Sequence, residues 1–436
     1  MRFFTTLLTV ALVLGMGATA YAELQNVEVG GSIRIRGNVY EMDESQVFAD
    51  SSWIEQRTRL NVKADFTDEV SAFIELDSYD VWGEDFRSAD YISGLDARAN
   101  SGDDVEVYQG YIEATEMWGT PLMMRVGRQE VSLGSEWLAG TNDAAAFFPG
   151  LSFDALTLGY ATDMVSVCAW AAKLNETLSD FGDDDVDFYG LYGSYLGFED
   201  AVIDAYWMFI RDDESLTAFD IDLHTIGLRG AGTYGAFDFE AEAAYQFGDA
   251  ELDTPWWMWW NDELDVDAFG ANLEAGYTFD MTWTPRIFLG GAYFEGSDDD
   301  DDEIPFNRLF SNWEYTEFLE NTAMSNVWVA RAGVSAMPTE SVELSLLASY
   351  FWADEVADGG WWFWSWEAED ELGLELGLYG DYQYSEDLVF RAGWAHFFGD
   401  DGLEDGNMIV ANGLLPYFGD EDDDYDYLFV ETEISF

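Results

Sequence analysis

Two closely spaced arginine pairs are the side chains best suited to binding chemistry in this sequence. Arg34 and Arg36 form the first pair, and Arg57 and Arg59 form the second. Residues two apart in a β-strand point to the same face of the sheet, so each pair presents two guanidiniums together. A guanidinium binds carboxylates and phosphates through its planar fork of hydrogen-bond donors. The spacing therefore indicates a surface that binds anionic groups.

Carboxylates at similar spacing offer these arginines partners within the protein itself. Glu28, Glu55, Glu75 and Glu431 are examples in segments that we expect to be strands. Opposite charges on neighbouring strands form cross-strand pairs that stabilise a sheet. Two interpretations stay open: the arginines bind an anionic solute, or they are rungs of a neutral ladder of ion pairs.

Catalytic chemistry has few candidate residues here. The chain has one cysteine, Cys168, and two histidines, His224 and His396. These are too few for a disulfide framework or a Cys/His zinc site, and they leave almost no choice for the histidine of a Ser-His-Asp triad. Glycoside hydrolysis needs two carboxylates, but no motif selects a pair among the 88 acidic residues. We therefore expect no enzyme activity and no cofactor.

Two acidic runs, residues 298–302 and 420–424, carry oxygen ligands of the kind that Ca²⁺ prefers. Neither run has the glycine and the ligand spacing of an EF-hand loop. The alternative to a defined calcium site is a solvated surface that binds cations weakly. The candidate ligands are Asp298, Asp300, Asp302, Asp422 and Asp424.

Alternation of polar and apolar residues places most of the chain on β-strands. Over residues 27–39 the odd positions are apolar or glycine and the even positions are mostly polar, and residues 54–66 repeat the pattern. Segments of this kind run for roughly ten residues, about the length that a strand tilted by about 45° needs to cross a bilayer. Apolar groups outside and charges inside are typical of a transmembrane β-barrel.

Eighteen such segments can be counted, and short connections alternate with long ones. We therefore predict an all-β fold, a closed antiparallel transmembrane barrel of about 18 strands with short periplasmic turns and long acidic extracellular loops. The segments centre near residues 33, 60, 75, 111, 125, 158, 168, 191, 206, 227, 242, 272, 290, 331, 346, 377, 393 and 430. The long loops cover roughly residues 42–52, 82–103, 130–152, 174–185, 212–219, 249–264, 297–323, 354–368 and 400–424.

The ends of the chain and its charge indicate the compartment. An apolar run over residues 3–17 is followed by Ala20-Tyr21-Ala22, the small-x-small form of a signal-peptidase site. We expect a signal peptide over residues 1–22, cleavage after Ala22, and one barrel domain over residues 23–436. The last strand ends on Phe436 and resembles the C-terminal strand signal of bacterial outer-membrane proteins. These features predict the outer membrane of a Gram-negative-type bacterium.

Composition narrows the classes of partner. The chain has 17 basic residues against 88 acidic ones, a net charge of −71, which excludes a nucleic-acid binder because phosphate affinity needs clustered Lys and Arg. Its aromatic content of 17% argues against an acidic disordered chain. The expected partners are outer-membrane lipid and lipopolysaccharide, the outer-membrane insertion machinery, and a small-molecule or oligosaccharide solute.

One region of about 35 residues resembles a known family. Val126-Gly127-Arg128-Gln129, then Leu138-Ala139-Gly140, then Ser152-Phe153-Asp154 are similar to the motif region of alginate-export-type outer-membrane proteins. In that family a strand ends in Gly-Arg-Gln, a loop carries Arg-Leu-x-Gly, and the next strand opens with Phe-Asp-Gly. The family forms an eighteen-stranded barrel whose arginine-rich lumen conducts a polyuronate. The resemblance implies a similar channel, or porin, here.

The resemblance adds residues to the candidate site, and departures from the family motif bear on which solute the site binds. It carries Arg128 and Gln129 over as lumen residues, and Arg125 lies two residues before Gly127. The candidate solute-binding residues are Arg34, Arg36, Arg57, Arg59, Arg125, Arg128 and Gln129. We also expect loop 130–152 to fold inward and narrow the pore. Two departures weaken the inference of alginate as the solute, because Trp137 stands where the family has an arginine and Ala155 replaces its glycine.

Two functional hypotheses follow from the sequence. The first is an outer-membrane channel for small or oligomeric solutes, with anionic sugars among them. The alternative is an abundant structural or adhesive surface barrel whose acidic loops bind divalent cations. Tryptophan clusters at residues 256–260 and 361–366 suit either sugar stacking or an external aromatic girdle.

Overall fold

The computed structural model describes residues 24–42, 50–83, 105–141, 143, 148–176, 185–212, 219–252, 263–297, 303–318, 324–356, 358–361, 364–367, 369–404 and 424–436. The expected signal peptide and its cleavage site lie outside these residues, as does the first tryptophan cluster. The side chains of the second cluster lie outside them too.

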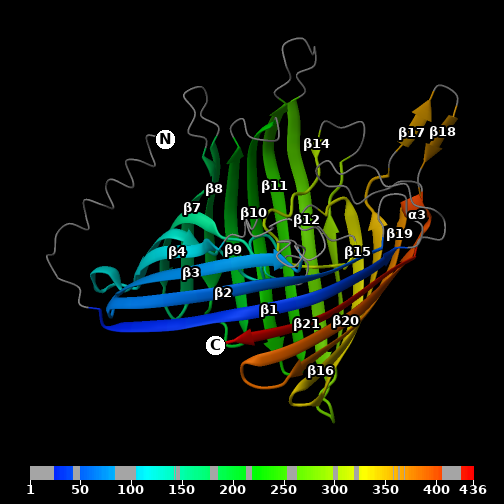
Figure 1. Cartoon of the computed structure of the whole chain (residues 1–436). Helices are drawn as coiled ribbons and strands as arrows, with labels where there is room; N and C mark the ends of the chain where they lie inside the picture. The colour runs from blue at the N-terminus through cyan, green and yellow to red at the C-terminus, as the bar shows by residue number, and fades with distance from the viewer. Residues whose placement is uncertain are drawn as a thin grey trace, which may run out of the picture.

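Eighteen antiparallel strands form the wall of the barrel, as the sequence predicts (Figure 1). Each contains one of the predicted segment centres. They are β1 (Asn26–Met42), β2 (Ser51–Thr67), β3 (Val70–Val81), β4 (Glu106–Ala114), β5 (Leu122–Gln129), β6 (Phe153–Ala161), β7 (Val165–Glu176), β8 (Asp185–Tyr195), β9 (Ala201–Asp212), β10 (Phe219–Tyr234), β11 (Phe237–Leu252), β12 (Glu263–Thr278), β13 (Arg286–Phe294), β15 (Val327–Thr339), β16 (Val342–Ala353), β19 (Glu371–Gln383), β20 (Leu388–Gly399) and β21 (Asp424–Ser435).

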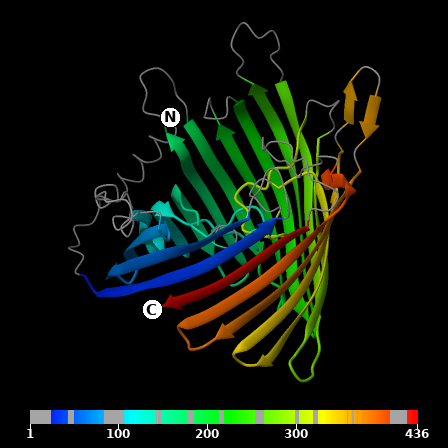
Figure 2. The same cartoon turned by 45° about the vertical axis from the view of Figure 1, so that its right-hand side comes forward.

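The first and last strands pair with each other and close the wall. The β1–β21 register runs from Ser32 opposite Ser435 to Met42 opposite Tyr425, which confirms the predicted closure. The wall is uneven in height, because β10, β11 and β12 have 16 residues each and β5 has only 8. Figures 1 and 2 show these tall strands across the barrel from the seam between β1 and β21.

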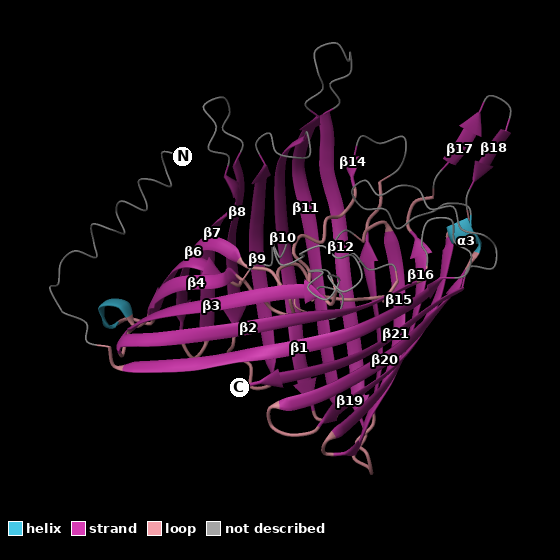
Figure 3. Ribbon diagram, viewed as in Figure 1, coloured by secondary structure: helices cyan, strands magenta, loops and turns pink. Residues whose placement is uncertain are grey.

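The remaining described elements are short. The two-residue strand β14 (Glu303–Ile304) pairs with β12 in parallel, and β17 (Asp358–Trp361) and β18 (Trp364–Glu367) form a separate hairpin. A single turn of 3-10 helix, η3 (Met117–Gly119), and one short helix, α3 (Asp401–Glu404), complete the set (Figure 3). Among the described residues, no helix has the length and apolar character to cross a membrane.

The outward face of the wall is apolar. The inward face carries charged side chains and, where it packs against interior loops, buried apolar side chains such as Met208 and Phe294. Large apolar side chains at mid-strand are exposed on the outside, for example Val430 at 60%, Leu228 at 63% and Leu289 at 69%. Farther along the same face, the rings of Trp207, Phe209, His224 and Phe247 stack in a row across β9, β10 and β11. Aromatic rows of this kind flank the apolar band of outer-membrane barrels.

A charge in this apolar band is expected to destabilise the barrel. Replacing Leu228, near the middle of β10, by Arg should lower the free energy of unfolding in lipid by about 2–4 kcal/mol, because lipid does not solvate a guanidinium. The matched change Tyr234→Arg, at the end of the same strand, should cost at most about 1 kcal/mol near the interface. Urea unfolding of both variants in liposomes measures the difference, and equal losses would contradict the assignment of the band.

Candidate functional site: the arginine cluster and the two inner loops

Pairing of the first two strands brings four inward arginines together. In the β1–β2 register Arg34 lies directly opposite Arg57, and Arg36 and Arg59 follow one pair away on either side. Like charges opposite each other destabilise a sheet unless counter-ions neutralise them. We call Arg34, Arg36, Arg57 and Arg59 the arginine cluster. Each is buried, with 3–7% of its surface exposed.

One buried carboxylate from the last strand serves two members of the cluster. Glu431 on β21 accepts hydrogen bonds from Arg34 Nε at 2.9 Å and Arg36 Nε at 2.8 Å. It also accepts one at 2.6 Å from Arg391 Nη1 on β20. The Glu431 side chain has no exposed surface, so three guanidiniums share a carboxylate that is sealed from solvent. These contacts join β20, β21 and β1 at the seam of the barrel.

A second carboxylate comes from the loop between β5 and β6, residues 130–152, which we call the first inner loop. Its Asp143 bonds Arg57 Nη1, and it lies 3.4 Å from Arg59 Nη1 and 3.5 Å from Arg34 Nη1. The cluster also donates to loop carbonyls, from Arg57 to Phe148 at 2.8 Å and from Arg59 to Pro149 at 2.9 Å. The described part of this loop therefore folds inward, as the sequence predicts, and it covers the cluster.

The cluster carries no excess of positive charge. Arg59 also lies within 4.0 Å of Glu75, Asp77 and Glu130. Together with Glu431 and Asp143, five carboxylates thus contact four guanidiniums. Burial raises the pKa of the Glu130 carboxyl, which accepts a hydrogen bond from Tyr108. Of the two interpretations from the sequence, the geometry favours the ladder of ion pairs.

In the loop between β13 and β15, residues 297–323, the described residues 303–318 also fold inward, and we call this loop the second inner loop. The sequence predicts this loop outside the barrel, and that prediction is wrong for residues 303–318. Phe306 and Tyr315 are each 1% exposed, and Gln246 on the wall donates to the Asn307 carbonyl at 2.7 Å. Phe306, Leu309, Phe310, Trp313 and Tyr315 form an aromatic and aliphatic run that needs burial, and this run is the sequence signal for the inward fold.

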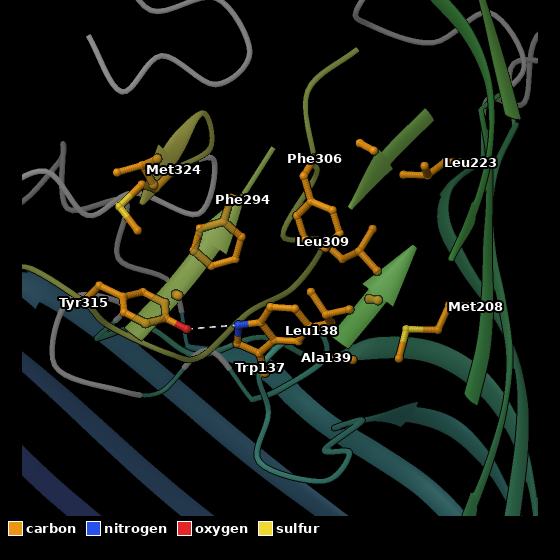
Figure 4. Packing of buried hydrophobic residues seen from close by; sticks show 14 of the residues in the cluster. Trp137, Leu138, Ala139, Met208, Leu223, Phe294, Phe306, Leu309, Tyr315 and Met324 are labelled. Carbon is orange, nitrogen blue, oxygen red and sulfur yellow. Dashed lines mark hydrogen bonds between the residues drawn. The ribbon is translucent and has the colours of Figure 1, made fainter. Parts of the chain in front are cut away.

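The two inner loops pack against each other inside the barrel. Ala139 and Phe310 form a parallel β-bridge, and Asn312 donates its backbone N–H to the Glu136 carbonyl at 2.9 Å. Trp137 is completely buried, and its Nε1–H donates to the Tyr315 hydroxyl at 3.0 Å (Figure 4). Trp137 also stacks near Phe294 and Phe306, with ring centroids 5.9 and 6.0 Å away. Thus the residue that replaces a family arginine fastens the two loops together.

Truncation of this tryptophan is expected to leave a large cavity between the loops. Trp137→Ala should lower the free energy of unfolding by about 3–5 kcal/mol, the usual cost of removing a buried aromatic side chain. Trp118→Ala is the matched control, because Trp118 lies in a short turn with 73% of its surface exposed. Denaturant unfolding in detergent compares the two. Similar midpoints for both variants would show that the inner loops do not pack as described.

Arg125 and Gln129 lie on the inward face of β5, but their partners are structural. Arg125 donates two hydrogen bonds to Glu113 Oε2 on β4, at 2.6 and 2.8 Å. Gln129 is 1% exposed and donates to the backbone carbonyls of Gly127 and Ala155. Neither residue contacts the arginine cluster.

Arg128 lies on the other face of β5, which corrects its placement in the lumen. Its side chain is 43% exposed and makes two hydrogen bonds of 2.9 Å to Asp154 on β6. The register continues from Asp154 to Lys173 on β7, and from Lys173 to Asp187 on β8. This row of alternating charges follows the outward face near the extracellular ends of the strands. Charge costs little there because the bilayer interface is close.

The structure leaves the calcium prediction untested. Asp298, Asp300, Asp302 and Asp422 lie outside the described residues. Asp424 begins β21, and its carboxylate is 3.8 Å from His396 Nε2. Within the described ranges, no group of three or more His, Cys, Asp or Glu is placed to hold a metal ion.

One further arginine on the inward face is not among the solute-binding residues predicted from the sequence. Arg331 on β15 points inward beside Ser349 of β16 and Gly290 of β13. It makes no hydrogen bond or ion pair with any residue of the described ranges, and the Tyr315 ring lies 5.3 Å from its guanidinium carbon. Alternation on β15 identifies its face, and the pairing shows that neither of its two cross-strand neighbours carries a carboxylate.

Comparison with known proteins agrees with this architecture. The alginate export family model matches residues 25–361. The fold resembles three solved structures at 11–13% identity: OccAB3 and OccAB1 of Acinetobacter baumannii and OccD3 (OpdP) of Pseudomonas aeruginosa, with TM-scores of 0.57, 0.56 and 0.54. These matches cover 94%, 96% and 95% of this chain and 100%, 98% and 93% of the other chains, respectively. No protein among the curated sequences matches.

The family match covers well over half of the chain and includes both inner loops and the arginine cluster. The eighteen-stranded wall with its apolar outer band agrees with it. The chain therefore belongs to the alginate export family and is an outer-membrane β-barrel channel.

Proposed function

We propose that this channel passes small hydrophilic solutes, prefers cations, and acts without catalysis. The observation that carries the proposal is the burial and neutralisation of the arginine cluster. A solute binds an arginine through exposed donors, but the side chains of these four arginines are at most 8% exposed and already contact Glu431, Asp143 and three further carboxylates. The cluster holds the first inner loop against the wall. Because the charge of the cluster is already neutralised, the remaining acidic side chains determine the electrostatic potential in the pore.

The alternative within the family is a path for an anionic polysaccharide. Such a path needs a run of accessible basic groups along the lumen. Here Trp137 takes the place of one family arginine, and Arg128 lies on the outward face. Both positions reduce the basic surface that a polyuronate would meet.

Solute uptake into protein-containing liposomes tests the proposal. Swelling rates are compared for arabinose, glucosamine, glucuronate and short alginate oligomers, with protein-free liposomes as the control. We expect arabinose and glucosamine to enter faster than glucuronate, because a cation-preferring pore repels the carboxylate. Faster entry of glucuronate or of the oligomers than of arabinose would contradict the proposal and support a polyuronate path.

A further inference from the structure

A pocket of about 230 Å³ lies inside the barrel between the second inner loop and the wall. Its charged lining consists of Arg331, Glu314, Glu317 and Glu375, and its rings come from Tyr315, Tyr379 and Phe429. Arg331 and Glu375 are contributed by wall strands, and Glu314 and Glu317 by the loop. The pocket thus combines one cation with several carboxylates and aromatic surface.

Arg331 has hydrogen-bonding capacity that its described surroundings do not use. Its Nε is buried without a hydrogen-bond partner among those residues, and the same holds for the hydroxyl of Ser349, its direct neighbour on β16. The other cross-strand neighbour of Arg331, Gly290 on β13, has no side chain. Buried polar groups in folded proteins are nearly always paired, so two such groups side by side indicate a missing polar partner.

The strand register determines how far the backbone of Arg331 lies from that of Glu375. Ser349 on β16 pairs with Arg331 on one side and with Glu375 on the other. Arg331 and Glu375 are therefore two strands apart on one inward row, which is about 10 Å between backbones. Glu375 accepts hydrogen bonds from the Thr316 hydroxyl and the Glu317 N–H, so its carboxylate is held in position.

From these observations we infer that the pocket binds a small zwitterion, a solute with a carboxylate and an ammonium group such as an α-amino acid. The carboxylate of the solute bonds Arg331, and its ammonium lies among Glu314, Glu317 and Glu375. A simple anion would meet three carboxylates and one arginine, and a simple cation would leave Arg331 without a partner. The rings of Tyr315, Tyr379 and Phe429 provide the contact for an apolar side chain. The inference rests on the proposed function, because the solute reaches this pocket through the lumen.

Binding to refolded protein in detergent micelles tests this assignment without requiring transport. The probes are L-phenylalanine, 3-phenylpropionate, which lacks the ammonium, and phenethylamine, which lacks the carboxylate. Calorimetry should show phenylalanine binding at least about tenfold more tightly than either analogue, since each loses one charged contact worth about 1.4 kcal/mol or more. Equal affinities for phenylalanine and phenethylamine would overturn the assignment.

Variants of Arg331 test whether this residue binds the carboxylate of phenylalanine. Arg331→Gln should reduce the affinity for phenylalanine to that for phenethylamine, and Arg331→Lys should retain part of it. The control is Arg286→Gln, on the neighbouring strand β13, whose guanidinium is paired with Asp238 and Glu274. Unchanged phenylalanine binding in folded Arg331→Gln protein would overturn the inference. Ion selectivity in KCl, measured on the same preparation, separates the two proposals: cation preference without phenylalanine binding overturns the pocket assignment alone, and anion preference overturns the proposed function.

Discussion

Replacing Glu431 by Gln is expected to lower the free energy of unfolding by about 3–5 kcal/mol, the cost of breaking a buried ion pair by removing one partner. Glu431 is 1% exposed and bonds Arg34, Arg36 and Arg391. The amide keeps the shape of the side chain but removes the charge that three guanidiniums share. Because these contacts connect β1, β20 and β21, the seam of the barrel should open first.

Glu433→Gln is the matched control for this experiment. Glu433 lies two residues farther along the same face of β21 and pairs with Arg391 at 2.8 Å, but its side chain is 22% exposed. A partly solvated pair contributes at most about 1 kcal/mol. Urea unfolding in liposomes, followed by tryptophan fluorescence, compares the two variants. A loss for Glu431→Gln no larger than that for Glu433→Gln would show that the seam does not depend on the shared carboxylate.

Replacing Asp143 by Asn is expected to change both ion selectivity and conductance. Asp143 contacts Arg34, Arg57 and Arg59 and holds the first inner loop over them. Without its charge the loop should lift from the wall and uncover part of the cluster. One unit charge at 4 Å is worth about 1 kcal/mol in bulk water and more in a narrow pore. We therefore expect the Cl⁻ to K⁺ permeability ratio to rise by about fivefold or more.

The control removes the same charge from the same loop without touching the cluster. Glu136 accepts hydrogen bonds from Asn312 and Thr141 of the inner loops. Glu136→Gln should shift selectivity much less than Asp143→Asn and leave the conductance unchanged. Planar-bilayer recordings of both variants distinguish uncovering of the cluster from loss of loop charge. Equal shifts in ion selectivity for the two variants would mean that permeating ions do not reach the cluster, whether or not the loop covers it.

Strand positions and faces followed from the sequence because they depend on local periodicity. Arg34 and Arg57 were expected on the polar face, and both point inward. The placement of Arg128 shows the limit of a motif. Arg125 and Arg128 are three residues apart, so a strand must direct them to opposite faces. The family resemblance suggested the lumen for Arg128, but strand geometry determined its position.

The partners of the arginines could not be read from the sequence. Asp143 is more than 80 residues from Arg57 along the chain and reaches it only because the first inner loop folds back into the barrel. The second inner loop was expected outside because it is one of the long connections, which lie on the outer side of such barrels. Burial of its apolar run from Phe306 to Tyr315 stabilises the inward fold instead. Contacts between segments far apart in the sequence depend on how the whole barrel folds, and local sequence patterns do not predict them.

The reversal potential of the wild-type channel in a planar bilayer, under a tenfold KCl gradient, tests the central claim most directly. If the arginine cluster is buried and neutralised, acidic groups set the field in the pore, and the reversal potential should have the sign of K⁺ preference. Raising the salt on both sides should weaken the preference, since screening shortens to about 3 Å at 1 M. A reversal potential with the sign of Cl⁻ preference would contradict the account, because the arginines would then face the permeating ions.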